Sequence, residues 1–268
     1  MRHPSIPSIV HLTLKRDSML NILTIPPTKL LLSLVYVDFL AVLLAIGLGF
    51  ALHHSPTAYT GEGEPITWLS FAHLLVTSGL AWEVFSRRTG GSLQRSVWRS
   101  PTFVWFLIAL GFLFLAIDEI VAIHESVDHL FHRTFQIQET GLTDRLDDVI
   151  VLGYGLIGVG VLYAYRGELV RYKSVLPLVI CGFVLFVLMG LLDALVNRDD
   201  VFLFLGISKE GSYALAMWIG GVEEGLKILA EAALLGATYT CVFLTPENGK
   251  ASDSRVDAQE GDEGGRRD

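Results

Sequence analysis

The sequence predicts an all-α polytopic membrane protein, a bundle of six transmembrane helices with both the N and C termini in the cytoplasm. Of its 268 residues, 51% are hydrophobic and only 18% are charged. The mean hydropathy of +0.50 is too high for an ordinary soluble domain. Apolar segments also recur along the chain, each close to the ~20 residues that a helix needs to cross a ~30 Å hydrocarbon core.

The predicted transmembrane domain covers residues 30–244. Its apolar segments lie at 30–53, 66–86, 102–124, 147–165, 174–197 and 212–244. A doubly wound α/β protein would instead alternate short apolar strands with amphipathic helices, a pattern that this chain lacks. We therefore expect six helices and no sheet.

The distribution of Lys and Arg predicts the orientation. Eleven of these residues lie in segments that would share one side of the membrane: Arg2, Lys15, Arg16, Lys29, Arg87, Arg88, Arg95, Arg99, Arg166, Arg171 and Lys173. Four lie in the opposite loops: Arg133, Arg145, Arg198 and Lys209. Because cytoplasmic loops carry the excess of Lys and Arg, the richer side is predicted to be cytoplasmic.

The two ends of the chain are predicted to lie outside the bundle. Residues 1–29 are proline-rich and lack the apolar core and cleavage site of a secretory signal peptide. Residues 245–268 form an acidic tail without apolar anchors, which we expect to be disordered in the cytoplasm. The net charge of -8 comes largely from this tail and from the membrane carboxylates. We therefore expect membrane lipids as partners and no nucleic acid, in a multi-pass protein of the cell membrane.

Ionisable residues in the apolar segments are the main functional signal. The stretch FLAIDEIVAIHESVDHLFH, residues 114–132, places acids and histidines in what reads as one continuous helix. At ~100° per residue, Asp118, Glu125, His129 and His132 would share a sector of ~60°. The last segment carries a second polar stripe, made of Glu223, Glu224, Lys227 and Glu231. Both stripes are expected to face the interior of the bundle.

The cost of these charges argues that they have a function. An ionised carboxylate at mid-membrane costs ~2.5–3.5 kcal/mol. Lys227 is the one positive charge set against seven carboxylates in these segments, those of Asp118, Glu119, Glu125, Asp193, Glu223, Glu224 and Glu231. Unpaired, they would cost more than the ~5–15 kcal/mol of a typical net stability. Protons, bound cations or an aqueous cavity must therefore neutralise or solvate them.

Other ionisable residues have simpler interpretations. His73 is expected to be a hydrogen-bonded core histidine, and Glu83 to extend towards the membrane surface or pair with Arg87, its i+4 neighbour. Asp144, Asp147 and Asp148 read as an N-cap and an acidic first helical turn.

Two motifs resemble known signatures without their context. GYGLIG, residues 153–158, has the glycine spacing of a dinucleotide site but lies inside a predicted membrane helix. Its glycines, and Gly221 and Gly225 of the last segment, are expected to let neighbouring helices approach closely. HESVD, residues 124–128, has Asp128 where a zincin has its second histidine.

The combination of AIDEIVAIHE with the later GVEEGLKILAE resembles a group of uncharacterised bacterial multi-pass membrane proteins. These proteins carry an Asp-Glu-x4-His-Glu motif and a later helix with a Glu-Glu pair. The resemblance covers the third to sixth segments and implies a six-helix bundle without implying an activity. Lys227 departs from the pattern, since that position is usually acidic or apolar in the group. The signature residues would be Asp118, Glu119, His124, Glu125, Glu223 and Glu224.

The first functional hypothesis is a metal site in the outer half of the membrane. Carboxylates with neutral imidazole suit iron, manganese or zinc, and a catalytic metal would act on a lipid-like substrate. The di-metal carboxylate bundles use a Glu-x-x-His spacing that this sequence lacks. The candidate ligands are Asp118, Glu119, His124, Glu125, Asp193, Glu223 and Glu224.

The alternative is a proton or cation relay along the acidic residues, as in pumps and transporters. Its relay or supporting groups would be Lys227, Glu231, His129 and Asp38. The absence of an inverted repeat in the sequence weighs against a transporter, and the crowding of acids in the outer half favours the metal site. A non-catalytic membrane subunit is the third hypothesis.

Overall fold

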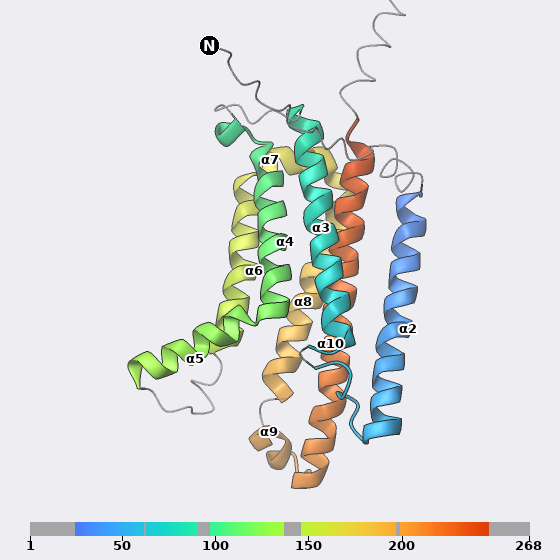
Figure 1. Ribbon diagram of the computed structural model, residues 1–268, viewed down its shortest axis with the longest axis vertical. Coiled ribbons are helices and arrows are strands. Elements are labelled where there is room, and N and C mark those ends of the chain that lie inside the picture. Colours follow the sequence, from blue (N-terminus) through green and yellow to red (C-terminus); the bar gives the residue numbers. More distant parts are fainter. Residues whose placement is uncertain (1–24, 62, 91–96, 137–145, 197–198, 247–268) are drawn as a thin grey trace, which may run out of the picture.

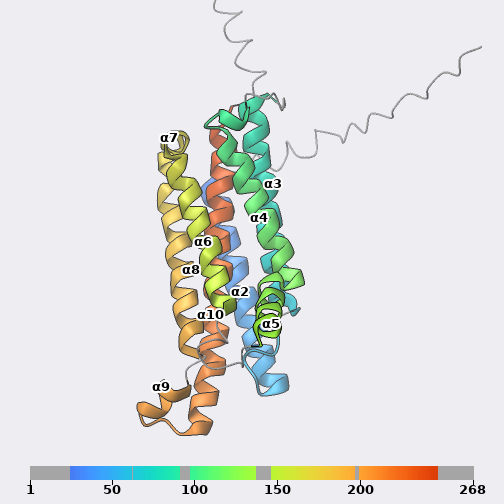
Figure 2. The ribbon, with the colours of Figure 1, turned by 90° about the vertical axis from the view of Figure 1, so that its left-hand side faces the viewer.

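The computed structural model describes residues 25–61, 63–90, 97–136, 146–196 and 199–246, and all regular secondary structure within these ranges is helical. The long helices lie side by side in an elongated bundle (Figures 1 and 2), which confirms the all-α prediction. The elements are α2 (Pro27–His53), α3 (Pro65–Thr89), η2 (Val97–Arg99), α4 (Phe103–Val121), α5 (Ile123–Phe135), α6 (Leu146–Ala164), α7 (Arg166–Leu169), η3 (Val170–Val175), α8 (Leu176–Val196), α9 (Asp199–Phe204) and α10 (Lys209–Leu244).

Five stretches of helix are long and apolar enough to cross a membrane: Pro27–His53, Pro65–Thr89, Phe103–Val121, Arg166–Leu195 and Lys209–Leu244. The sixth predicted span corresponds to α6, a shorter apolar helix described over Val149–Ala164. α6 lies beside α4 and runs from the end of the bundle near α5 to α7 (Figure 1). The structure therefore supports five of the six predicted spans by length and composition, and the sixth stays a prediction.

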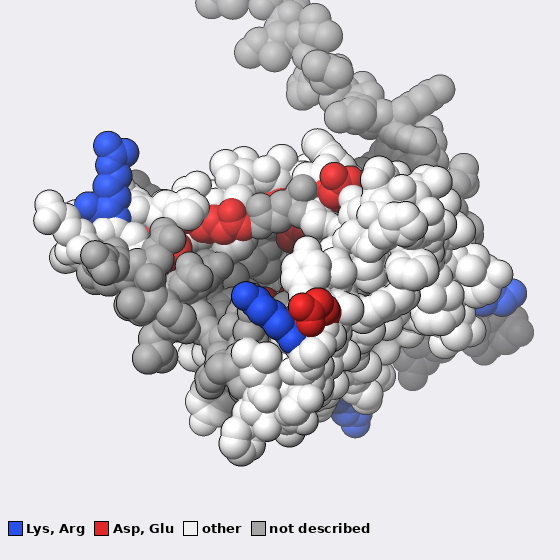
Figure 3. Space-filling model, turned by 90° about the horizontal axis from the view of Figure 1, so that it is seen from below, with Lys and Arg blue, Asp and Glu red and all other residues white. Residues whose placement is uncertain are grey.

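The two ends of the bundle differ in charge. The start of α2 and the end of α10 lie at the same end (Figure 1), together with Arg87 and Arg88 in the last turn of α3 and the basic residues of α7 and η3. We call this the basic end. The opposite end, near α5 and α9, shows several acidic side chains near its middle, with basic side chains beside them and at the edges (Figure 3), and we call it the acidic end.

The long helices of the bundle begin at Pro27 and end at Leu244. α10 ends at Leu244, whereas α2 begins at Pro27, three residues before the predicted start at residue 30. Pro27 at the first helical position explains the earlier start, because its fixed φ suits a helix N-terminus and its missing N–H is not needed there. Residues 1–24 of the predicted N-terminal segment and residues 247–268 of the predicted acidic tail lie outside the described residues.

Helix α10 is the central element of the bundle. It packs against α8, α3 and α2, and it is buried almost continuously from Ile228 to Val242. At the basic end its Ala237, Cys241 and Val242 join an apolar core shared with α3, α4 and η3. Nearer its middle, Ile228 joins a smaller core with α2 and α3. Side chains on α10 can therefore reach partners on three neighbouring helices.

Glycines were predicted to allow close helix packing in two segments. The structure shows such packing for one of them. A Cβ on Gly221 would lie 3.2 Å from Ile46 of α2, and one on Gly225 would lie 3.3 Å from Val42, which confirms that a neighbouring helix approaches closely there and identifies it as α2. A Cβ on Gly153, Gly155, Gly158 or Gly160 would meet nothing within 4 Å. The prediction that the α6 glycines serve close packing is therefore wrong for the described part of the chain.

The acidic stretch 114–132 is two helices and not one. Ala122 has φ 51° and ψ 54°, a left-handed conformation that ends α4 and starts α5. α5 then turns away from the bundle (Figures 1 and 2). The prediction that Asp118, Glu125, His129 and His132 share one face of a continuous helix is therefore wrong. Local capping by Asp118, described below, stabilises the turn.

The end of α2 provides a test of this packing. A Cβ on Gly49 would lie 2.6 Å from the backbone oxygen of Ser55, whereas one on Gly47 would meet nothing within 4 Å. We expect Gly49→Ala to lower the free energy of unfolding by ~1–3 kcal/mol, the usual effect of overpacking. Gly47→Ala, in the same helix, should leave it unchanged or slightly raised. Thermal unfolding in detergent measures both, and equal stabilities would contradict the described α2 turn.

Candidate functional site

A lysine at the middle of α10 holds two carboxylates together. Lys227 Nζ lies 3.1 Å from Glu119 Oε1 of α4 and 2.8 Å from Glu224 Oε2 on its own helix. All three side chains are largely buried, with 17–22% of each exposed. Lys227 donates the hydrogen bond to Glu119. The ammonium group therefore occupies the space between the acidic residues of α4 and α10, where the sequence predicted a metal.

The helical period explains why α10 presents these groups together. Residues three and four apart lie on one face of a helix, so Glu224, Lys227 and Glu231 follow each other along the side of α10. The sequence predicted this stripe and its orientation towards the interior. The ion pair within α10 joins Lys227 to Glu224, three residues earlier in the helix.

A second cluster lies one helical turn further along α10. His73 of α3 stands between two carboxylates: its Nε2 is 3.4 Å from Asp38 Oδ1 of α2, and its Nδ1 is 3.8 Å from Glu231 Oε2 of α10. The hydroxyl of Ser70, on α3, donates a 2.7 Å hydrogen bond to Glu231 Oε1. Three helices thus contribute to a single group, which we call the Asp38–His73–Glu231 cluster.

This cluster is the most deeply buried group of ionisable residues among those described. Asp38 is 1% exposed, Glu231 3% and His73 5%. Both carboxylate oxygens of Asp38, together with Glu231 Oε2 and His73 Nδ1, have no hydrogen-bond partner within the described chain. A buried carboxylate without donors is unstable when ionised. The cluster therefore has the capacity to bind a proton.

Asp118 and His124 form a local cap at the break after α4. Asp118 Oδ1 accepts a 3.0 Å hydrogen bond from the backbone N–H of His124, and Oδ2 lies 3.0 Å from His124 Nδ1. The Ala122 N–H bonds back to the carbonyl of Asp118 at 2.7 Å. Glu125 Oε1 is 3.9 Å from His124 Nε2. These residues, predicted as metal ligands, are thus engaged with one another at the α4–α5 junction.

The remaining predicted site residues lie elsewhere on their helices. Glu223 of α10 and Asp193 of α8 are partly buried, and His129 is exposed on α5. The pairing of Glu83 with Arg87 is confirmed by a 2.7 Å contact. Asp144 and the side chains of Asp147 and Asp148 lie outside the description.

Sequence reasoning missed His73 and Ser70 as members of a site. Read alone, His73 suggested a core histidine, and Ser70 gave no signal. Their depth was the available clue, because Asp38, His73 and Glu231 all lie between about three and five helical turns from the basic end. Side chains at similar depth in adjacent helices can meet.

No group of three or more His, Cys, Asp or Glu side chains in the described residues is arranged to hold a metal ion. Four of the predicted ligands make other contacts in this structure: Glu119 and Glu224 pair with Lys227, and Asp118 pairs with His124. The predicted iron, manganese or zinc site stays a prediction.

Residues 28–242 match the family described as a domain of unknown function (DUF8692). The chain belongs to this family. The match spans all the long helices, so both ionisable clusters lie within the family's domain. Comparison with curated proteins gives no match, and neither does comparison with solved structures.

Removing the Lys227 ammonium should destabilise the protein. Lys227→Met leaves Glu119 and Glu224 facing each other without a cation, and breaking a buried pair costs ~3 kcal/mol. Adding Glu119→Gln and Glu224→Gln to Lys227→Met should recover most of this loss. Lys209→Met, at the exposed start of α10, is the matched control with the same loss of charge. Equal melting temperatures for the Lys227 and Lys209 variants would contradict the assigned ion pairs.

Proposed function

We propose that this member of the DUF8692 family is a multi-pass protein of the cell membrane that conducts protons through its core, using the Asp38–His73–Glu231 cluster as the relay. The observation that supports this most is the His73 imidazole, which stands between two buried carboxylates on different helices. The proposal takes up the relay hypothesis and adds His73 as its central group.

The chemistry of imidazole suits this position. A histidine can accept a proton on one ring nitrogen and release it from the other. Its Nε2 faces Asp38 at 3.4 Å and its Nδ1 faces Glu231 at 3.8 Å. These distances are slightly longer than direct hydrogen bonds, so a small side-chain shift would complete the path. A proton could then pass from Glu231 to Asp38, or in reverse.

The balance of charge also favours a proton. Two ionised carboxylates at this depth would be costly, and only Ser70 donates a hydrogen bond to either of them within the described chain. A bound proton removes one negative charge without the six or so ligands that a larger cation requires. The relay therefore alternates between states that hold different numbers of protons.

On the side of the cluster that faces the acidic end, Lys227 lies one helical turn before Glu231 on α10 and pairs with Glu119 of α4. This ion pair is not part of the relay, because a lysine ammonium donates hydrogen bonds and cannot accept a proton. Acidic side chains are exposed at that end (Figure 3), where they would attract cations from solution. With six spans, the basic end would face the cytoplasm, and protons would enter from the outer side.

Replacing the His73 imidazole should strongly reduce conduction. We expect proteoliposomes containing the unaltered protein to acidify when a K⁺ diffusion potential drives protons inward, as reported by an entrapped pH dye. His73→Gln should lower this flux by at least about tenfold, since positioned acid–base groups contribute ~100-fold or more to proton transfer. Asp38→Asn and Glu231→Gln should each have a similar effect.

Matched controls separate the relay from general damage. His129→Gln changes an exposed histidine of α5, and Glu83→Gln changes an acid that pairs with Arg87 near the basic end. Both should retain the flux, and all variants should first be shown to be folded by thermal unfolding in detergent. A flux that persists in folded His73→Gln, or a protein no more conductive than empty liposomes, would rule the proposal out.

A further inference from the structure

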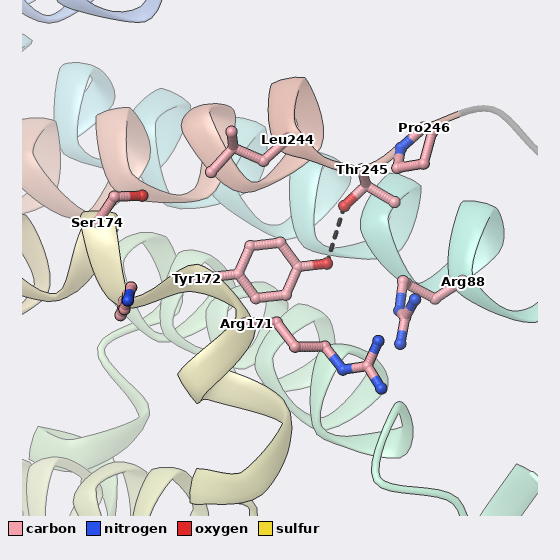
Figure 4. A pocket seen from close by; sticks show the side chains of 8 residues that line it. Arg88, Arg171, Tyr172, Ser174, Leu244, Thr245 and Pro246 are labelled. Atoms are coloured by element: carbon pink, nitrogen blue, oxygen red, sulfur yellow. Dashed lines mark hydrogen bonds between the residues drawn. The ribbon is translucent and has the colours of Figure 1, made fainter.

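A pocket of about 470 Å³ opens at the basic end, well away from the Asp38–His73–Glu231 cluster. It lies between the end of α3, the η3 segment and the end of α10 (Figure 4). Arg88, Arg171 and Lys173 contribute three cationic side chains to its lining. In the close view the guanidinium groups of Arg88 and Arg171 lie on the same side of the pocket (Figure 4).

The positive charge of this pocket is only partly balanced. Glu168 of α7 is 2% exposed and accepts hydrogen bonds from Arg88 at 3.0 and 3.3 Å. Arg171 Nε lies 3.3 Å from the same carboxylate. Lys173 is exposed and has no ion pair among the described residues. Two arginines thus contact one carboxylate, and with Lys173 the described lining of the pocket has an excess of positive charge.

The walls of the pocket are held by hydrogen bonds. The Tyr172 hydroxyl lies 2.9 Å from Thr245 Oγ1 (Figure 4), and the Thr245 hydroxyl donates to the carbonyl of Cys241 at 2.8 Å. Arg87 donates to the carbonyls of Val242 and Thr245. Buried Glu168 orients the guanidinium of Arg88 in the same way. The basic groups therefore surround a pocket that is already formed.

We propose that this pocket binds a phosphate group, that of an anionic phospholipid headgroup or of a soluble phosphate ester. Guanidinium groups match the geometry of phosphate oxygens and bind them through paired, charge-assisted hydrogen bonds. Leu244 and Pro246 add apolar surface beside the cations, which suits a glycerol backbone or the start of an acyl chain. Basic pockets between transmembrane helices at one membrane face are typical of such binding.

The test uses the full-length protein in detergent and short-chain lipids. Dioctanoyl phosphatidylglycerol, dioctanoyl phosphatidylcholine and glycerol 3-phosphate are titrated separately, and bound molecules are counted by native mass spectrometry. We expect phosphatidylglycerol to bind to the unaltered protein. The Arg171→Ala/Lys173→Ala variant should bind it at least about tenfold more weakly, since hydrogen bonds between charged groups are lost. Arg88 is left unchanged because its loss would strand the buried Glu168 carboxylate.

The control removes the same charge from the same end of the bundle. Lys29→Ala/Arg99→Ala changes two exposed residues outside the pocket and should weaken binding no more than about threefold. If glycerol 3-phosphate binds as tightly as the lipid and the pocket variant loses this binding, the ligand is a soluble phosphate ester. Phosphatidylglycerol affinities that are equal in the pocket and control variants, or equal to that of phosphatidylcholine in the unaltered protein, would overturn the proposal.

Discussion

The arrangement of the bundle depends on one constraint: the charges of α10 must be neutralised by side chains from other helices. Within a hydrocarbon core there is no water to solvate an ammonium or a carboxylate, so each buried charge needs a partner. Lys227 finds Glu119 on α4, and Glu231 finds Ser70 and His73 on α3. Through His73 the same group extends to Asp38 of α2. These polar contacts connect α2, α3, α4 and α10. They fix the rotation of each helix about its own axis, which apolar packing alone would define only weakly.

Small residues on α10 make these contacts geometrically possible. Side chains as short as Asp and Ser can meet across an interface only when the helix axes lie close together. Gly225 brings α2 close to α10 through Val42, which lies one turn from Asp38. On the other side, a Cβ on Gly182 of α8 would meet Leu234 at 2.8 Å. The burial of charge on α10 therefore depends on its close packing, because a wider separation of the helix axes would leave the acidic side chains without partners.

Much of the fold could be predicted from the sequence, and the site only in part. The apolar segments predicted the long helices because length and hydropathy determine which segments can span a membrane, and the i+3/i+4 spacing predicted the polar stripe of α10. The break at Ala122 could not be predicted, because alanine favours helix and carries no turn signal. That break depends on Asp118, whose carboxylate caps the next helix. The partners of Lys227 and Glu231 also escaped prediction, since they come from α4 and α3, and one sequence does not specify which helices are neighbours.

The two clusters on α10 differ in a way that bears on what each can do. Around Lys227 the contacts are short, 2.8 and 3.1 Å, and join a permanent cation to carboxylates, so this group has little reason to exchange protons. Around His73 the contacts are 3.4 and 3.8 Å, and several carboxylate oxygens have no donor within the described chain. A site whose hydrogen bonds are all satisfied resists a change of protonation. A site with carboxylate oxygens that lack donors can bind a proton without breaking existing hydrogen bonds. One helix therefore places an ion pair beside an incompletely hydrogen-bonded cluster. The ion pair joins α4 to α10, and in the proposed relay the cluster exchanges protons while that pair stays intact.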